Sequence, residues 1–230
     1  MHARFQTLPD PLPADPMPIA STWLSQAWDE QARRNPNSMS LATTAADGKP
    51  SVRIVLCKEI VADPGYLVFY TNYDSRKGRD LAQHPWAAVV FQWDTLGRQL
   101  RVEGPVVRAL ASESDDYFAS RPWRSRLAAI MSEQSEPIAS RQLLVQRLRE
   151  TATRFGAPDP FTTPEDDVEP GLRLPRPPNW GGYRLWAAAV ELWVEGEHRL
   201  HDRARWTREM APAGGGRFHA EPWRHERLQP

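Results

Sequence analysis

Four short segments of the chain concentrate side chains that could bind anions or move protons. The first is residues 53–58, an apolar, strand-like run with Arg53 at one end and Lys58 at the other. A cation buried without a partner is strongly destabilising, so each should meet an anion or reach water. Strict alternation along a strand puts Arg53 and Lys58 on opposite faces. Both could serve one cavity only if a bulge or the strand end re-aims one of them.

The second segment reads as a strand end that runs into the start of a helix. It carries hydroxyl groups and cations, in Tyr70, Thr71, Ser75, Arg76 and Lys77. Free backbone N–H groups and the helix dipole at such a position add to the side-chain charges, which makes it a candidate phosphate-binding site. An ordinary helix start with exposed cations is the alternative.

The third segment offers a phenol, a guanidinium and a hydroxyl at four-residue spacing, in Tyr117, Arg121 and Ser125. On a helical path this spacing puts the three groups on one side. A planar guanidinium with hydroxyl donors beside it suits a phosphate monoester. A solvated helix face explains the pattern equally well when the segment is taken alone.

The fourth segment, residues 197–203, places six ionisable side chains between two apolar strands, which is hard to explain as packing. Zinc binding by His198 and His201 is disfavoured because no cysteine or third histidine lies at ligand spacing, so no metal is expected. Asp202 could simply pair with a neighbouring arginine.

The composition narrows the class of protein. The chain has 230 residues, of which 40% are apolar, enough for one sizeable core. Lys+Arg and Asp+Glu both total 29, which argues against a nucleic-acid or anionic-membrane binder. The single cysteine, Cys57, excludes an intramolecular disulfide and fits a reducing compartment. No signal peptide or membrane span is evident, so we expect a soluble, cytoplasmic protein.

The hydrophobic pattern predicts an α+β fold. Residues 1–17 read as an irregular arm, Pro18 opens a helix with Ser21 or Thr22 near its start and Trp28 on its apolar stripe, and residues 35–37 end that helix. Strands are predicted at 39–43, 51–58, 66–71, 87–93, 99–107, 183–194 and 203–209, and helices at 75–83, at 112–131 with a break at Pro122, and at 138–155. The proline-rich residues 156–178 read as a long surface loop. Six or so strands joined largely by hairpins indicate an antiparallel β-barrel with peripheral helices, in one domain over 1–230.

Taken together and in order, these segments resemble the pyridoxamine 5'-phosphate oxidase family. The resemblance is carried by residues 12–16, 53–58, 69–77, 92–99, 117–125, 134–135, 180–184, 197–203 and 227–230. It implies an antiparallel split β-barrel that forms a homodimer, with FMN bound in the subunit interface.

The resemblance also implies roles for individual residues. FMN would be held by Arg53, Ile54, Val55, Leu56, Lys58, Tyr70, Thr71, Arg76, Lys77, Gln99, Gln134, Ser135, Trp193 and Arg203. The substrate phosphate would be held by Lys58, Tyr117, Arg121 and Ser125, while Arg199 and His201 would lie over the substrate ring as catalytic residues.

The implied reaction oxidises pyridoxamine or pyridoxine 5'-phosphate to pyridoxal 5'-phosphate, with O2 as electron acceptor and H2O2 as product. One alternative is an FMN oxidase of the phenazine-biosynthesis branch, with a tricyclic carboxylated substrate; Tyr117, Arg121 and Ser125 beside Lys58 favour a phosphate instead. Another is a non-catalytic flavin or pyridoxal phosphate carrier, which would not need Arg199 and His201. A split-barrel protein that binds haem or deazaflavin is a further alternative.

The sequence departs from the family pattern in three places, of which the first two concern substrate closure and regulation rather than FMN binding. The basic N-terminal arm is short and offers only Arg4 before Leu12, the loop 156–178 is longer than usual, and Cys57 stands where an aliphatic residue is usual.

Overall fold

The computed structural model describes residues 7–164 and 171–230, so Arg4 and the middle of the loop 156–178 lie outside the described residues. The described chain divides into two compact units. We call residues 7–69, 80–108 and 183–230 the barrel unit, and residues 70–79, 109–164 and 171–182 the helical unit. The expectation of a single domain over residues 1–230 stays a prediction.

Six strands of the described chain close a ring. They are β1 (Ser38–Thr44), β2 (Pro50–Val61), β3 (Tyr66–Asn72), β4 (Trp86–Trp93), β5 (Arg98–Arg108) and β6 (Trp180–Trp186). Hydrogen-bonded neighbours follow the order β4-β1-β2-β3-β6, and β6 also pairs with β5, which pairs with β4. The pairings are antiparallel for β1–β2, β1–β4, β2–β3, β4–β5 and β5–β6. This arrangement confirms the predicted antiparallel split β-barrel.

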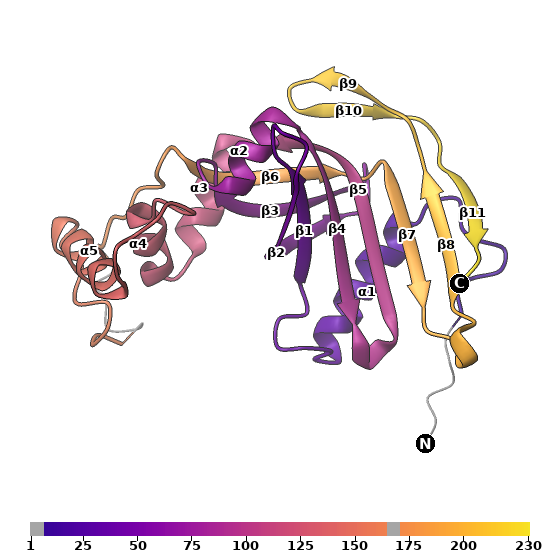
Figure 1. Cartoon of the computed structure of the whole chain (residues 1–230), viewed down its shortest axis with the longest axis horizontal. Coiled ribbons are helices and arrows are strands. Elements are labelled where there is room, and N and C mark those ends of the chain that lie inside the picture. The colour runs from indigo at the N-terminus through magenta and orange to yellow at the C-terminus, as the bar shows by residue number, and fades with distance from the viewer. Residues whose placement is uncertain (1–6, 165–170) are drawn as a thin grey trace. The chain divides into compact units, whose positions relative to one another are not determined.

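The sheet continues beyond the ring from β5. Strands β7 (Ala189–Val194), β8 (Asp202–Thr207) and β11 (Arg224–Leu228) add to it in that order, side by side in Figure 1, and β9 (Met210–Gly214) with β10 (Arg217–Ala220) forms a separate hairpin. The prediction of six or so strands agrees with the ring, whereas strands β9 to β11 outside it were not predicted. Residues 183–194 were predicted as one strand, but the chain breaks at Ala187 and Ala188, between β6 and β7. Two 3-10 turns, Asp94–Leu96 and Glu197–Arg199, connect β4 to β5 and β7 to β8.

Alternating side chains of the barrel strands form the core. The fully buried ones include Met39, Leu41, Leu67, Phe69, Phe91, Trp93 and Leu100. Helix α1 (Met17–Asp29) buries Met17, Ala20, Trp23, Leu24 and Ala27. Trp28 was predicted on this apolar face, but it is 51% exposed because it lies at the edge of the buried stripe of the helical wheel, in the last turn of the helix.

The boundaries of α1 also differ from the prediction. The helix begins at Met17, whose backbone N–H donates to Asp15 Oδ1 at 2.8 Å, so Asp15 rather than Ser21 or Thr22 satisfies its first turn. It ends at Asp29, before residues 35–37.

Three helices belong entirely to the helical unit: α3 (Ala111–Ser120), α4 (Trp123–Met131) and α5 (Arg141–Arg154). The predicted break at Pro122 separates α3 from α4. Helices α4 and α5 pack around the cluster Trp123, Leu127, Ala152 and Leu174. Leu174 lies in the proline-rich segment and is only 5% exposed, so that segment is not purely a surface loop as predicted. None of the helices in the described residues is both long enough and apolar enough to cross a bilayer.

Cys57 faces the barrel core, where burial raises the pKa of its thiol from 9.0 to about 12. The folded protein therefore keeps the thiol protonated when the unfolded chain has lost that proton, so stability falls as pH rises through the unfolded value near 9. We expect dithionitrobenzoate to label folded protein at pH 8 at least about 100-fold more slowly than urea-unfolded protein. Labelling at similar rates in both states would contradict this burial.

Candidate functional site

Arg53 has the partners that a buried cation requires. From β2 it donates to the Leu41 carbonyl at 3.1 Å, to Thr43 Oγ1 at 2.7 Å and to Ser51 Oγ at 2.8 Å. The carboxylate of Asp80 lies 3.7 Å from its guanidinium and also accepts from Thr43 at 2.6 Å. Asp80 is buried, so this ion pair is shielded from water.

The strand β2 contains the bulge that Lys58 would need to face the same side as Arg53. The register of β2 against β3 shifts between Cys57 and Glu59, which leaves Lys58 as the extra residue. The inward alternation changes phase at the same place, because Cys57 and Ile60 are both buried although they lie three positions apart. By this alternation, Lys58 belongs to the same face of β2 as Ile60, two positions further along the strand.

In the helical unit, Lys77 contacts two other residues that the resemblance assigns to FMN, Thr71 and Gln134. Its ammonium group donates to Gln134 Oε1 at 2.7 Å, to Thr71 Oγ1 at 3.0 Å and to Ser75 Oγ at 3.1 Å, and Thr71 Oγ1 donates to Gln134 Oε1 at 3.2 Å. Lys77 is only 8% exposed. We call these four side chains the Lys77 cluster. It forms a cationic, hydroxyl-bearing site at the start of α2 (Arg76–Gln83).

Ser75 caps α2: its hydroxyl accepts from the backbone N–H of Gly78 at 3.4 Å. Arg76 opens the helix with an exposed side chain. Ser135, next to Gln134, adopts a left-handed backbone with φ 78°. The structure gives no contact between Ser135 and the Lys77 cluster within the described residues.

Tyr117, Arg121 and Ser125 do not share one helix. Tyr117 lies in α3, Arg121 has left the helix with an extended backbone, and Ser125 lies in the first turn of α4. The prediction of a single helical path was therefore wrong, because Pro122 keeps the preceding residue out of the helical region. Arg121 instead stands immediately before a helix N-terminus, where free N–H groups also attract anions.

The rings around Arg121 form a stack in the helical unit. Tyr117 lies 4.0 Å from Tyr70 between ring centroids, and Tyr70 lies 5.6 Å from Trp180. The Arg121 guanidinium lies 4.6 Å from the Trp180 centroid. Tyr70, assigned to the cofactor, thus touches Tyr117, assigned to the substrate.

Strand register aligns three other assigned residues in the barrel unit. Gln99 of β5 lies opposite Trp193 of β7, and Trp193 lies opposite Arg203 of β8. Glu191, two residues before Trp193 and only 7% exposed, accepts from Arg203 at 2.8 and 3.1 Å and from Arg101 at 3.0 Å. The buried carboxylate thus orients Arg203 from a neighbouring row on the same sheet face.

The loop that carries Arg199 and His201 has an unusual backbone. His198 and Arg199 both have left-handed conformations, with φ 52° and 65°, which side chains other than glycine rarely adopt. A side chain at Gly196 would lie 1.9 Å from the Leu200 carbonyl, so the turn also requires a glycine there. Two strained residues in succession are typical of a functional site.

His201 packs against Trp193, with 4.5 Å between the ring centroids. Its Nδ1 accepts from the backbone N–H of Gly196 at 3.3 Å. In the neutral imidazole the proton is therefore on Nε2, which can donate to a ligand.

The left-handed backbone predicts opposite effects of glycine at two exposed histidines. At His198 the glycine variant should be more stable than the alanine variant by about 1 kcal/mol, since only alanine is strained there. At His219, in strand β10, the alanine variant should be the more stable by about 0.5–1 kcal/mol. Urea unfolding of the four variants measures both differences, and the same sign at both positions would contradict the strain at His198.

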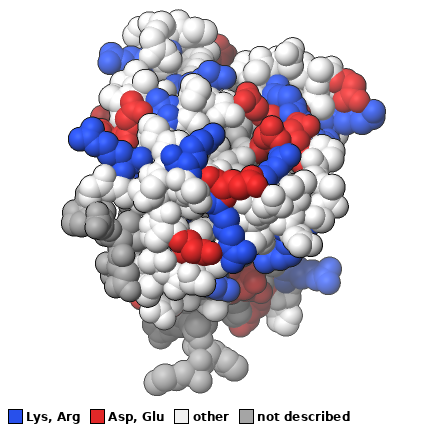
Figure 2. Space-filling model, turned by 90° about the vertical axis from the view of Figure 1, so that its left-hand side faces the viewer, with Lys and Arg blue, Asp and Glu red and all other residues white. Residues whose placement is uncertain are grey.

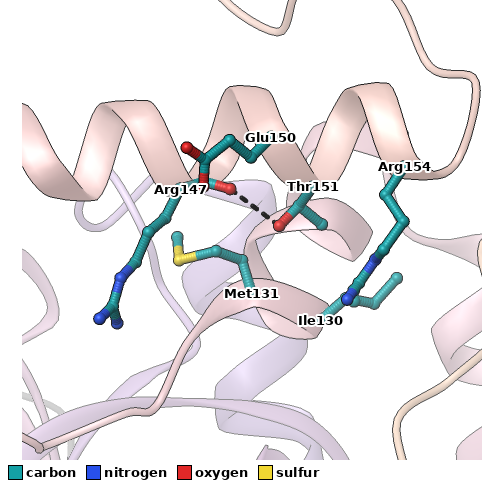
Figure 3. Close-up of a pocket in the computed structure, with 6 residues that line it drawn as sticks. All are labelled: Ile130, Met131, Arg147, Glu150, Thr151 and Arg154. Atoms are coloured by element: carbon teal, nitrogen blue, oxygen red, sulfur yellow. Dashed lines mark hydrogen bonds between the residues drawn. The ribbon is translucent and has the colours of Figure 1, made fainter.

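The charged surface and the open grooves do not mark the site. In the view of Figure 2, cationic and anionic side chains are interspersed rather than segregated. A groove of about 260 Å³ lies beside α4 and α5, lined by Ile130, Met131, Arg147, Glu150, Thr151 and Arg154 (Figure 3). It contains none of the assigned residues, and Arg147 at its edge pairs with Glu133 at 3.2 Å.

Sequence reasoning missed the supporting residues Asp80, Glu191 and Trp180. Glu191 had a local signal, because it is the one charged residue in the apolar run 185–194. Asp80 had none, since its partner Arg53 is distant in sequence.

Two family models match the chain. One, described as pyridoxamine 5'-phosphate oxidase, matches residues 25–155, and the other, described as the pyridoxine 5'-phosphate oxidase C-terminal dimerisation region, matches residues 180–230.

Among curated proteins, the pyridoxine/pyridoxamine 5'-phosphate oxidase of Gloeothece citriformis is 44% identical over 94% of this chain and 90% of its own length. The protein of that name from Burkholderia mallei is 46% identical over 90% of this chain and 86% of its own. Among solved structures, PhzG from Burkholderia lata, in complex with tetrahydrophenazine-1-carboxylic acid, is similar with a TM-score of 0.78 and 29% identity, over 96% of this chain and 95% of its own. The chain belongs to the pyridoxine/pyridoxamine 5'-phosphate oxidase family.

Proposed function

We propose that this protein oxidises pyridoxine and pyridoxamine 5'-phosphate to pyridoxal 5'-phosphate with FMN as cofactor and O2 as electron acceptor. The observation that carries the substrate class is Arg121. Its Nη1 is buried without a hydrogen-bond partner, and no carboxylate of the described residues lies within ion-pair distance of it. A half-buried guanidinium with no carboxylate beside it is well suited to an anionic ligand. The phosphate of the substrate supplies one.

The chain's own residues fit FMN. The Lys77 cluster offers a preorganised cation with hydroxyl groups to a phosphate, and the row Gln99, Trp193 and Arg203 offers polar groups beside a flat indole. The remaining residues assigned to FMN by resemblance stay a prediction. When bound, FMN supplies the acceptor for the hydride equivalent and the reaction with O2.

The protein positions the substrate between two kinds of group. Tyr117, Arg121, Ser125 and Lys58 hold its phosphate, while Arg199 and His201 lie over its ring. The Nε2–H of His201 donates a hydrogen bond to the substrate, and the guanidinium of Arg199 provides positive charge near the reacting carbon. Arg199 is exposed in this structure. Its charge is therefore solvated in the free protein, and no unpaired charge is buried before the substrate binds.

A tricyclic carboxylate of the phenazine type is the less favoured substrate. PhzG shares 29% identity with this chain, whereas the curated pyridoxine/pyridoxamine 5'-phosphate oxidases share 44–46%. A phosphate monoester also uses more donors than a carboxylate, which suits the combination of Tyr117, Arg121 and Ser125.

The active form is a homodimer. Val52, Ile54 and Leu56 of β2 are 68%, 61% and 38% exposed, and they share one sheet face with Trp86, which is 54% exposed. Strand register places the row that contains Gln99 on this same face. A partner subunit would bury these apolar side chains and lie against the row. The single, buried thiol of Cys57 suits the reducing cytoplasm, where we place the enzyme.

The decisive experiment measures H2O2 release and 4'-aldehyde formation from each phosphorylated vitamer, using purified protein with added FMN. Both products, together with a light-scattering mass of twice the 26.2 kDa chain, would support the proposal. Bound FMN without turnover of either vitamer would refute the substrate and favour a carrier. Turnover of a carboxylated tricycle alone would favour the phenazine-type oxidase.

A further inference from the structure

We propose that Trp180 is a positioning residue, whose indole face holds the Arg121 guanidinium in the orientation that receives the substrate phosphate. This inference rests on the proposed function for the identity of the anion. Trp180 itself belongs to no group assigned above to FMN or to the substrate.

The geometry around Arg121 leaves the indole as its main support. Arg121 lies 4.6 Å from the Trp180 centroid and 5.7 Å from that of Phe118, and Phe118 packs edge-on against Trp180 at 5.1 Å. No side-chain hydrogen bond or ion pair of Arg121 is formed within the described residues. Burial lowers the pKa of Arg121 from its ordinary value, although a guanidinium remains charged at neutral pH. Stacking restrains the plane of the guanidinium and leaves its N–H edge available for a ligand.

Trp180 is itself held firmly by its neighbours. It is 6% exposed, its backbone N–H donates to the Pro177 carbonyl at 3.0 Å, and its own carbonyl accepts from Arg176 at 2.6 Å. Arg176 in turn pairs with Asp115 of α3 at 2.6 Å. The helix that carries Tyr117 is thus linked to the backbone of Trp180.

Two glycines after Trp180 allow this placement. A side chain at Gly181 would lie 2.1 Å from the Tyr73 hydroxyl oxygen, and one at Gly182 would lie 2.9 Å from Tyr70 Cε1. The rings of Tyr70 and Tyr73 therefore close on a backbone without side chains. The segment Trp180-Gly181-Gly182 thus places the indole against the guanidinium of Arg121.

The test compares Trp180→Leu, which removes the aromatic face, with Trp180→Phe, which keeps one. We expect Trp180→Leu to raise KM for pyridoxine 5'-phosphate by about 5- to 30-fold, the effect of a partly desolvated cation–π contact, while kcat and the Kd of FMN change by less than about twofold. Trp180→Phe should recover most of the loss. Trp28→Leu, at an exposed position of α1, is the matched control and should behave as wild type.

Direct binding separates this inference from the proposed function. Calorimetry uses 4-deoxypyridoxine 5'-phosphate, which cannot be oxidised. Its Kd should rise from wild type through Trp180→Phe to Trp180→Leu, in the same order as KM. If wild type binds this analogue but oxidises neither vitamer, the proposed reaction fails while the role of Trp180 is still measured. An unchanged Kd in Trp180→Leu overturns the inference. So does an equal loss in Trp180→Phe and Trp180→Leu, which would indicate only a packing role.

Discussion

Replacing Arg199 with alanine is expected to lower the rate of flavin reduction by pyridoxine 5'-phosphate on the order of 100-fold, while FMN stays bound. The guanidinium contributes positive charge at the reacting carbon, and its loss affects the transition state more than the bound substrate. Alanine keeps a side chain in the left-handed conformation at φ 65°, so the strain of the loop is the same in both proteins. Anaerobic stopped-flow absorbance of the flavin measures the rate.

Arg217→Ala is the matched control for Arg199→Ala. Arg217 is an exposed arginine of strand β10, outside the assigned site, so its removal changes surface charge by the same amount. Its flavin-reduction rate should equal that of wild type. A normal rate in Arg199→Ala would remove Arg199 from the catalytic residues, whereas loss of FMN from that variant would make it a cofactor ligand instead.

Replacing Lys77 with methionine should weaken FMN binding by about 10- to 100-fold. Methionine fills much of the same buried space but leaves the acceptors Thr71, Ser75 and Gln134 without their shared donor. The substitution weakens the binding of the cofactor, so kcat at saturating FMN should change far less than the Kd of FMN. Quenching of flavin fluorescence during titration gives that Kd.

Lys49→Met separates this local effect from a change in net charge. Lys49 follows β1 in an exposed turn. Its ammonium group forms an ion pair with Asp47 at 2.6 Å. Its FMN affinity should match wild type at low and high salt. If Lys77→Met binds FMN normally, the Lys77 cluster is a structural network rather than a cofactor site.

Local patterns predicted the barrel well because its strands alternate strongly. Burial alternates along β1 and β4, and these strands lie within one residue of the predicted bounds 39–43 and 87–93. Strands β9 to β11 were missed because their side chains are mostly exposed and show no alternation of apolar and polar residues, so no inner face is visible in the sequence. The break at Ala187 lies inside a continuous apolar run, where periodicity has no information.

For the candidate site, the sequence supplied the residue types but not their partners. The need for an anion near Arg53 was predicted, whereas Asp80 as its source depends on how β2 and α2 meet in three dimensions. The bulge at Lys58 was named as a condition for one shared cavity, and its presence is confirmed. The support of Arg121 by Trp180 depends on a contact across 59 positions of sequence, which no local pattern contains.

The extra residue in β2 makes the strand tolerant of one particular deletion. Without Lys58, Ile60 would follow Cys57 at the regular spacing of two positions and stay on the core side of the strand. Glu59 would stay on the other side. Removing this single residue would therefore straighten the bulge and leave the buried side chains of β2 as they are. A variant library of β2 should accordingly keep folding when position 58 is replaced or deleted, so the bulge serves the placement of the Lys58 side chain rather than the core.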